Sequence, residues 1–202
     1  LDVIQQQAEE DLLHLAGVGV SERVTTPARE TWRTRFPWLA VNLVTAFIAS
    51  SVVRFFEATI HKWTALAAFM PIVAGMGGNA GTQTLTVFVR GLALGEIDWR
   101  GGLRAIWKEL LVGLGNGVAI GAITGLIVGL WTGQWVLAGI LLLAMCGNLV
   151  IAGVAGGLVP LVLERFGFDP AVASSIFVTT FTDTGGFFLF LGMATLAMKW
   201  VV

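Results

Sequence analysis

Five long apolar stretches, separated by short clusters of charged residues, constrain this chain more than any other feature. They cover roughly residues 39–59, 64–90, 109–131, 135–163 and 172–199. Each is close to the about 20 residues that an α-helix needs to cross a bilayer. A buried soluble helical bundle is the alternative, but only 12% of the residues are charged and 56% are hydrophobic. We therefore expect an all-α membrane protein with five transmembrane helices in a lipid bilayer.

The basic residues lie near the ends of these stretches and predict the orientation. With a cytoplasmic N-terminus, nine basic residues fall on the inner side, and Arg54, Lys62 and Lys199 fall on the outer side or its margin. Since basic residues are retained on the cytoplasmic side, the N-terminus is expected inside and the C-terminus outside a plasma (inner) membrane. Tryptophans near the ends of the stretches support these boundaries, because the indole ring prefers the membrane interface.

The first part of the chain differs from the rest. Apolar residues recur at helical spacing between residues 3 and 15, beside acidic residues, which indicates a short amphipathic cytoplasmic helix. A connector follows, and Pro37 is expected just ahead of the first span. The chain thus divides into a cytoplasmic helix and connector, residues 1–37, and a five-helix membrane domain, residues 38–202. It begins without methionine and no signal peptide is visible, so it reads as part of a longer protein.

Charge and motif content exclude several classes of function. The formal net charge of −1 gives no electrostatic case for nucleic-acid binding. The single cysteine, Cys146, lies inside a stretch, so neither an intrachain disulfide nor a cysteine-rich metal site can form. There is no P-loop and no H-E-x-x-H motif, and an intramembrane aspartyl protease needs two membrane aspartates where this chain has one. We expect no enzymatic activity.

Two glycine patterns mark the middle stretches. In the third stretch glycine recurs every fourth residue, which lets another helix approach closely where lipid offers no hydrophobic driving force. A Gly-Asn pair occurs in the second, third and fourth stretches, and we expect three buried amides, each hydrogen-bonded to another helix. The glycines of the first pattern are Gly113, Gly117, Gly121, Gly125 and Gly129, and the amides of the second are those of Asn79, Asn116 and Asn148.

Asp183 is the residue that most directly predicts chemistry. It lies near the middle of the fifth stretch, where insertion of a carboxylate costs at least about 2.5 kcal/mol. No basic residue lies at a similar depth in any stretch, so a translocated cation is the expected partner; a protonated aspartate that joins helices is the alternative. Thr179, Thr180, Thr182 and Thr184 would supply hydroxyl oxygens, and two glycines after Asp183 would loosen the helix and expose carbonyls.

The donor set indicates the kind of ion. Oxygen donors without clustered histidine or cysteine favour a hard cation, with Mg²⁺, Ca²⁺, Mn²⁺ and Co²⁺ all possible. Mg²⁺ retains several waters and is held by one or two carboxylates, which suits a single aspartate per chain. Because one carboxylate is too little for selective divalent binding, two-fold symmetry would have to bring a second copy of Asp183 to the axis of a homodimer.

Two segments and the N-terminal region carry a resemblance to a known family. The runs "PIVAGMGGNAGTQTLTVFVRGLALGEI" and "TTFTDTGGFFLFLG" resemble the signature of the MgtE family of magnesium channels, and "AEEDLLHLAGV" is similar to its plug helix. The resemblance implies a homodimer, five transmembrane helices per subunit, and a pore lined by the second and fifth helices in which Asp183 holds hydrated Mg²⁺. It also implies ion-path roles for Gly77, Gly78, Asn79, Gly81 and Gln83.

The chain departs from the family pattern in two respects. The family's cytoplasmic N domain and paired CBS domains, which sense Mg²⁺ and close the pore, are not in this sequence. Ser175, two turns before Asp183, stands where the best-known members have asparagine; its hydroxyl can still bind a metal-bound water. Together with Thr179 and Thr182, it completes the predicted set of metal-site residues.

We expect a passive channel for the divalent cation. A doubly charged ion that moves down a potential of 100 mV releases about 4.6 kcal/mol, twice the ~2.3 kcal/mol per charge, so inward flow needs no coupled ion. The alternative is a secondary transporter that exchanges the divalent cation for Na⁺ or H⁺ with Asp183 as the shared site. Such a carrier would have broken helices in matching halves of the chain.

Overall fold

The computed structural model describes residues 22–171 and 174–201, with the side chains of residues 199–201 left out. All regular structure in this part of the chain is helical. The amphipathic helix expected between residues 3 and 15 lies outside the described residues. The helices are α2 (Ala28–Phe55), α3 (Glu57–Lys62), α4 (Ala65–Ala93), α5 (Trp99–Thr132), α6 (Trp135–Arg165) and α7 (Ser174–Val201).

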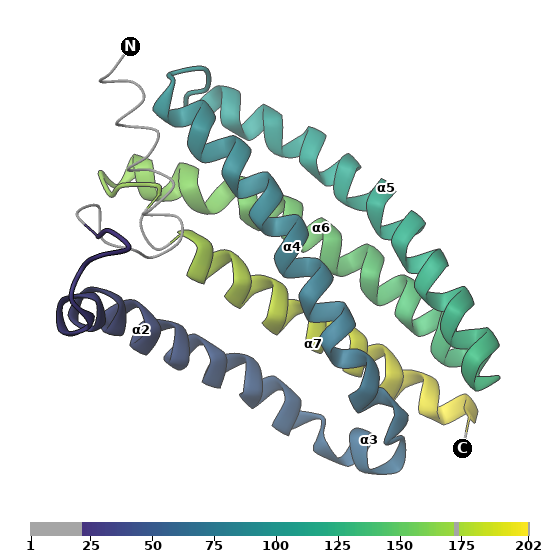
Figure 1. Ribbon diagram of the computed structural model, residues 1–202. Coiled ribbons are helices and arrows are strands. Elements are labelled where there is room, and N and C mark those ends of the chain that lie inside the picture. The colour runs from purple at the N-terminus through teal and green to yellow at the C-terminus, as the bar shows by residue number, and fades with distance from the viewer. Residues whose placement is uncertain (1–21, 172–173, 202) are drawn as a thin grey trace.

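The long helices run alternately in opposite directions between the two ends of a bundle (Figure 1). α6 is the central helix, because it packs against α4, α5 and α7. It is also the most buried, with a row of small and branched apolar residues on the faces that its neighbours cover. α2 lies at the edge and packs chiefly against α7, which leaves most of its apolar side chains exposed.

Four helices of the described part are long and apolar enough to cross a membrane: α2, α5, α6 and the α7 segment Ser174–Met198. α4 is not among them, although it has 29 residues. The reason is composition, since glycine, asparagine, glutamine and threonine lower its hydropathy in the segment that the sequence singles out. The all-α fold and four candidate spans are thus confirmed, and the segment predicted as the second span is helical, although it does not meet the hydropathy of the other four.

Two helices begin about ten residues earlier than the predicted spans. α2 starts at Ala28 and continues through Pro37, which lies inside the helix and not ahead of it as expected. α5 starts at Trp99, and its first turn is capped by Asp98, whose carboxylate accepts a hydrogen bond of 2.7 Å from the Gly101 N–H. Both extensions carry charged residues, because the ends of these helices continue past the apolar segment that hydropathy detects.

The glycine stripe of α5 packs against α6 as predicted. A Cβ atom at Gly113 would lie 2.5 Å from the Leu149 carbonyl oxygen, and one at Gly117 would lie 2.5 Å from the Cys146 Cα. At Gly121, Gly125 and Gly129 a Cβ atom would lie 2.9, 2.8 and 2.7 Å from α6, in the last case from the ring of Trp135, its first residue. The two backbones therefore approach closely over the length of the stripe, which is the packing that small residues allow in lipid.

Only one of the three expected buried amides is buried. Asn148 of α6 is fully buried and donates a hydrogen bond of 2.8 Å from Nδ2 to the Val73 carbonyl oxygen of α4. Asn79 and Asn116 are exposed in this chain, so that part of the expectation is wrong. Asn79 is exposed on α4, and Asn116 lines a pocket between α4, α5 and α6, which the Gly-Asn spacing alone does not reveal.

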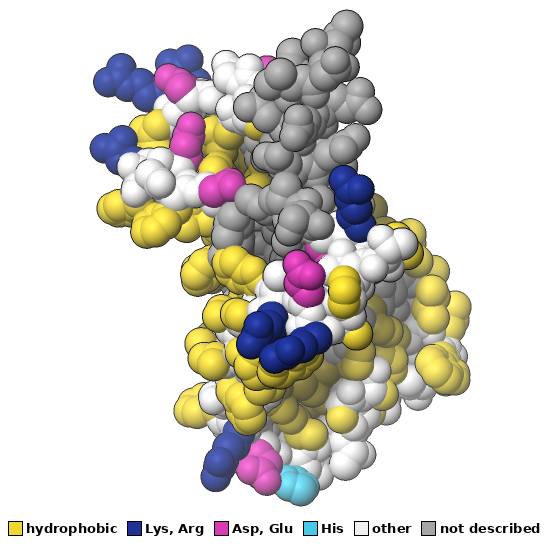
Figure 2. Space-filling view, turned by 60° about the vertical axis from the view of Figure 1, so that its left-hand side comes forward, with side chains coloured by type: hydrophobic (Ala, Val, Ile, Leu, Met, Phe, Trp, Pro, Cys, Tyr) yellow, Lys and Arg dark blue, Asp and Glu magenta, His cyan; other side chains and the backbone are white. Residues whose placement is uncertain are grey.

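Charged side chains lie near the two ends of the bundle. The end at which α2 begins and α4 ends carries Lys and Arg side chains among hydrophobic ones, and the flanks are mostly hydrophobic (Figure 2). At the opposite end, the Glu57 carboxylate lies 3.5 Å from His61 Nε2. The helix breaks at Phe56, so Arg54 and Glu57 do not share the regular i, i+3 spacing of one helix.

Candidate functional site

Asp183 lies in the first half of α7, partly buried, well away from either end of the helix. Within the described residues its carboxylate has no hydrogen bond to protein and no ion pair. Neither of its carboxylate oxygens is fully buried. An ionised carboxylate in a membrane span is costly unless it faces water, a cation or a protein partner.

Three of the four threonines around Asp183 turn their hydroxyl protons back into the helix, whereas Thr184 Oγ1 is buried and has no hydrogen-bond partner in the described part of the chain. Thr179, Thr180 and Thr182 each donate to a carbonyl oxygen three or four residues earlier, at 2.6–3.0 Å. The lone pairs of those hydroxyl oxygens remain available to accept hydrogen bonds. Thr182 is fully buried, whereas Ser175, in the first turn of α7, and Thr179 are partly exposed. The metal-site roles of these residues stay predictions.

The two segments that the sequence singled out lie against each other. A Cβ atom at Gly81 of α4 would lie 2.6 Å from Val178 and 3.6 Å from Thr182 of α7. Gly81 thus allows α4 to contact α7 one residue before Asp183. The glycine-rich helix and the aspartate helix are neighbours, as a shared ion path along both would require.

Asn148 joins the same two segments through α6. A Cβ atom at Gly77 would lie 2.2 Å from Asn148 Nδ2, and a Cβ atom at Gly186 would lie 2.6 Å from the same nitrogen. The Asn148 Oδ1 is buried and has no hydrogen-bond partner in the described part of the protein. One buried amide therefore sets the approach of α4 and α7, three residues beyond Asp183.

The glycines that follow Asp183 have a different role from the one expected. α7 is continuous through Gly185 and Gly186, so the helix is not loosened there. A Cβ atom at Gly185 would lie 2.7 Å from Ile151 of α6. The expectation of exposed carbonyls at this point is wrong, because both glycines serve close packing against α6.

The glycines of α4 divide into two kinds. Gly77 and Gly81 are buried and tightly packed, as described above. A Cβ atom at Gly75 or Gly78 would meet nothing within 4 Å in the described structure. Thr82, one turn after Gly78, is exposed and donates to the Gly78 carbonyl oxygen at 2.9 Å. This open side of α4, which also exposes Asn79, is the one along which an ion could pass.

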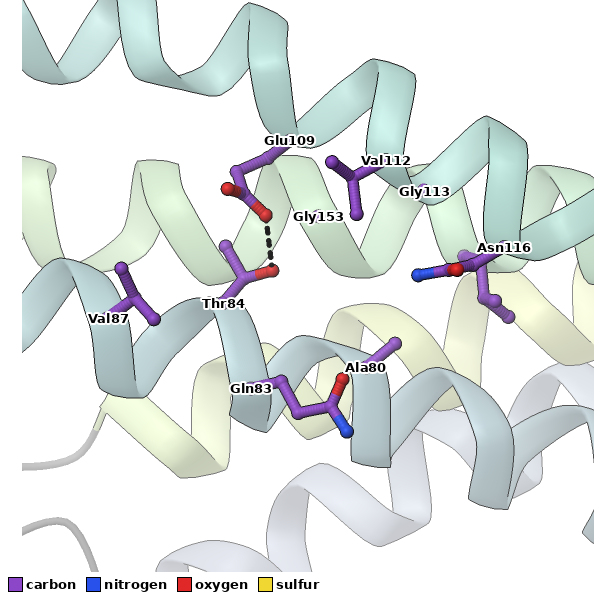
Figure 3. A pocket seen from close by; sticks show the side chains of 10 residues that line it. Ala80, Gln83, Thr84, Val87, Glu109, Val112, Gly113, Asn116 and Gly153 are labelled. Atoms are coloured by element: carbon purple, nitrogen blue, oxygen red, sulfur yellow. Dashed lines mark hydrogen bonds between the residues drawn. The ribbon is translucent and has the colours of Figure 1, made fainter.

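Gln83 lies in another environment. It lines a pocket with Thr84 of α4 and with Glu109 and Asn116 of α5, backed by Gly153 of α6 (Figure 3). The Thr84 hydroxyl donates to Glu109 Oε2 at 3.0 Å, and Glu109 is only 8% exposed. Sequence reasoning missed Glu109 because the predicted span began at that residue, which made it an end residue and not a buried acid.

The described part of the chain holds no cluster of donors for a resident metal centre. Among the described residues, no three His, Cys, Asp or Glu side chains gather closely enough to hold a metal ion. Asp183 has no charged partner among the described residues, and Glu109 has one, the Lys108 ammonium at 3.1 Å from Oε1. The chemistry open to them is the transient or weak binding of a cation that keeps part of its water.

Comparison with known proteins agrees with this donor set. A family model described as "MgtE: Divalent cation transporter" matches residues 70–193, which include both signature segments and all the predicted metal-site residues. That match covers more than half of the chain.

Curated relatives carry one name. The chain is 34% identical to "Magnesium transporter MgtE" of Enterococcus faecalis over 202 residues, which are the whole chain and 44% of that protein. It is 33% identical to the protein of the same name from Thermus thermophilus over 205 residues, covering 98% of the chain and 44% of the relative. The chain therefore spans less than half the length of these relatives. It belongs to the MgtE family of divalent cation transporters.

Proposed function

We propose that this chain forms a passive path for a divalent cation, with Asp183 as the residue that binds the ion. The observation that carries the proposal is the environment of the Asp183 carboxylate. It lies inside a candidate span, is partly buried, and has no hydrogen-bonding or ionic partner in the described structure. A travelling cation balances such a charge without a permanent partner.

The proposed substrate is Mg²⁺. The relatives with the same domain are named magnesium transporters, and the groups near Asp183 are oxygen donors. Mg²⁺ gives up its water slowly, so a single carboxylate that contacts the hydrated ion suits it better than a closed cage. Mn²⁺, Ca²⁺ and Co²⁺ accept the same donors and are the ions to compare.

The proposed membrane arrangement has five spans, with α4 as the second. A helix of 29 residues is about 43 Å long at 1.5 Å per residue, which exceeds the hydrocarbon core of about 30 Å. α4 packs against α6 and α7, both candidate spans. Its polar residues need not face lipid if the open side of the helix lines the ion path. The N-terminal ends of α2, α5 and α7 then lie on the cytoplasmic side.

A homodimer completes the proposed site. One carboxylate is weak for a divalent ion, and the α4 side with Gly75, Gly78 and Asn79 is uncovered in the single chain. A second copy related by a two-fold axis would close this side and contribute its own Asp183. In a full-length member we expect cytoplasmic N and CBS domains to be linked to this domain.

Uptake of Mg²⁺ into liposomes tests the proposal. The protein is reconstituted, and entry of Mg²⁺ is followed with a fluorescent indicator while a K⁺ gradient with valinomycin sets the potential. We expect uptake that rises with inside-negative potential in the absence of Na⁺ and pH gradients. Uptake that requires a Na⁺ or H⁺ gradient would instead identify the exchanger, and no uptake above empty liposomes would refute both.

A further inference from the structure

The pocket between α4, α5 and α6 holds Glu109, the one acid that is buried in the described spans. Glu109 lies well inside α5, and its side chain is only 11% exposed. Burial of a carboxylate in such a helix is costly unless its charge is balanced and its oxygens are hydrogen-bonded. The surroundings of Glu109 therefore need an account of their own.

The bonds that Glu109 makes leave part of its capacity unused. The Thr84 hydroxyl donates to Oε2 at 3.0 Å, and the Lys108 ammonium lies 3.1 Å from Oε1. An ionised carboxylate can accept about four hydrogen bonds or ligand contacts, so each oxygen keeps one free position. The Lys108 side chain is 69% exposed, and such a hydrated ion pair is weak and easily exchanged.

Two amides extend the pocket toward the middle of the membrane. Gln83 of α4 and Asn116 of α5 both line it and both are exposed in the chain. Asn116 lies near the midpoint of α5, and its side chain reaches into the space beside α4 (Figure 3). Primary amides that faced lipid at this depth would lack hydrogen bonds. The pocket must therefore be hydrated or hold a ligand that uses these amides.

The volume and donors of the pocket favour a small cation with some of its water. The pocket measures about 150 Å³, which equals roughly five waters at about 30 Å³ each. The side-chain groups that line it offer carboxylate, hydroxyl and amide oxygens, and these are ligands for hard cations. The adjacent Lys108 already balances one negative charge. A monovalent ion that displaces this ammonium keeps the site neutral, whereas a divalent ion leaves one excess positive charge in this low-dielectric region.

We propose that this pocket binds one small monovalent metal cation, of which Na⁺ is the probe, through Glu109 and Thr84 with Gln83 and Asn116 as the inner donors. The site is independent of Asp183. α6 lies between α5 and α7, which holds the two carboxylates in different parts of the bundle. Binding here would also strengthen the contact between α4 and α5, which otherwise touch little along their length.

Binding of ²²Na⁺ to the detergent-solubilised protein tests the site without requiring transport. We expect saturable binding that unlabelled Na⁺ competes away and that N-methylglucamine, too large for the pocket, does not. Glu109→Gln should weaken the affinity by about tenfold or more, the loss typical when a metal site loses a supporting group. Glu96→Gln, an exposed acid in the turn before α5, is the matched control and should bind Na⁺ normally.

A second variant keeps the test decisive if Glu109→Gln does not fold. Asn116→Leu removes an exposed amide of similar size and leaves the Thr84–Glu109 hydrogen bond intact, so it should fold and still weaken Na⁺ binding. Three results would overturn the proposal. They are no saturable Na⁺ binding, binding that survives both substitutions, and binding that is lost only in Asp183→Asn. Loss of Na⁺ on addition of micromolar Mg²⁺ would likewise assign the pocket to a divalent ion.

Discussion

At the scale of single residues, neighbouring glycines of one motif have opposite surroundings. Gly77 faces the fully buried amide of Asn148, whereas Gly78 faces open space. The sequence could predict that this segment mattered, because glycine and amides in a membrane helix are unusual. It could not separate the two glycines, since their environments depend on where α6 and α7 pack. Nor could the sequence predict that Gln83 lines the pocket beside Glu109, because this too depends on how the helices pack.

Alanine substitutions should separate these two glycines. In Gly77→Ala the new Cβ atom would lie 2.2 Å from Asn148 Nδ2, so the amide must move. We expect a loss of about 1–3 kcal/mol of stability, the usual cost of overpacking a core. Gly78→Ala should be close to neutral. Thermal unfolding in detergent measures both, and equal unfolding temperatures for the two variants would contradict this account.

A double substitution identifies the contact responsible. Asn148→Ala removes the amide that the new methyl group would meet, at the expense of the hydrogen bond to the Val73 carbonyl oxygen. In this background Gly77→Ala should destabilise the protein much less than in the wild type. Strict additivity of the two changes in unfolding temperature would show that Asn148 is not the limiting neighbour.

At the scale of helices, the sequence predicts packing where a pattern repeats. The five glycines of α5 indicated a close helix contact, and the structure supplies the partner, α6. The predicted span bounds agree with α4, α6 and α7 to within three residues, and they miss the start of α2 and α5 by about ten. Hydropathy cannot detect the charged turns by which these two helices extend beyond the apolar segment.

Leucine substitutions on the two faces of α5 test this contact. A Cβ atom at Gly121 would lie 2.9 Å from the Leu142 carbonyl oxygen, so Gly121→Leu forces α5 away from α6. We expect aggregation or loss of a monodisperse species in size-exclusion chromatography. Gly115→Leu, on the open face of the same helix, is the control and should elute like the wild type. Normal behaviour of Gly121→Leu would refute the packing role of the stripe.

At the scale of the whole molecule, the alternating directions of the long helices and the distribution of charge predict how the chain crosses the membrane. Helix α3, which contains His61, lies at the end of the bundle opposite the connection between α4 and α5, which contains Glu96 (Figure 1). Both side chains are exposed. A membrane-impermeant maleimide should therefore label His61→Cys from outside cells, and Glu96→Cys only after permeabilisation, each in a Cys146→Ser background. The reverse pattern would invert the proposed orientation.

The sequence and the structure agree on the position of one unpaired carboxylate, that of Asp183, within a candidate span. Asp183 was predictable because it is the one aspartate within the apolar stretches. The contact between Gly81 and Thr182, the residue before Asp183, could not be predicted from the sequence, because the two residues lie about a hundred positions apart. The proposal that two copies meet around the ion follows from the weakness of one carboxylate, and is tested by the mass of the detergent-solubilised particle.

The most direct measurement of the central claim is Mg²⁺ uptake into liposomes that contain Asp183→Asn. This change keeps the size of the side chain and removes its charge. We expect uptake to fall close to that of empty liposomes while the protein elutes as the wild type does. Asp98→Asn is the matched control, because asparagine caps a helix as well as aspartate does, and it should transport normally. Wild-type uptake by Asp183→Asn would contradict the account.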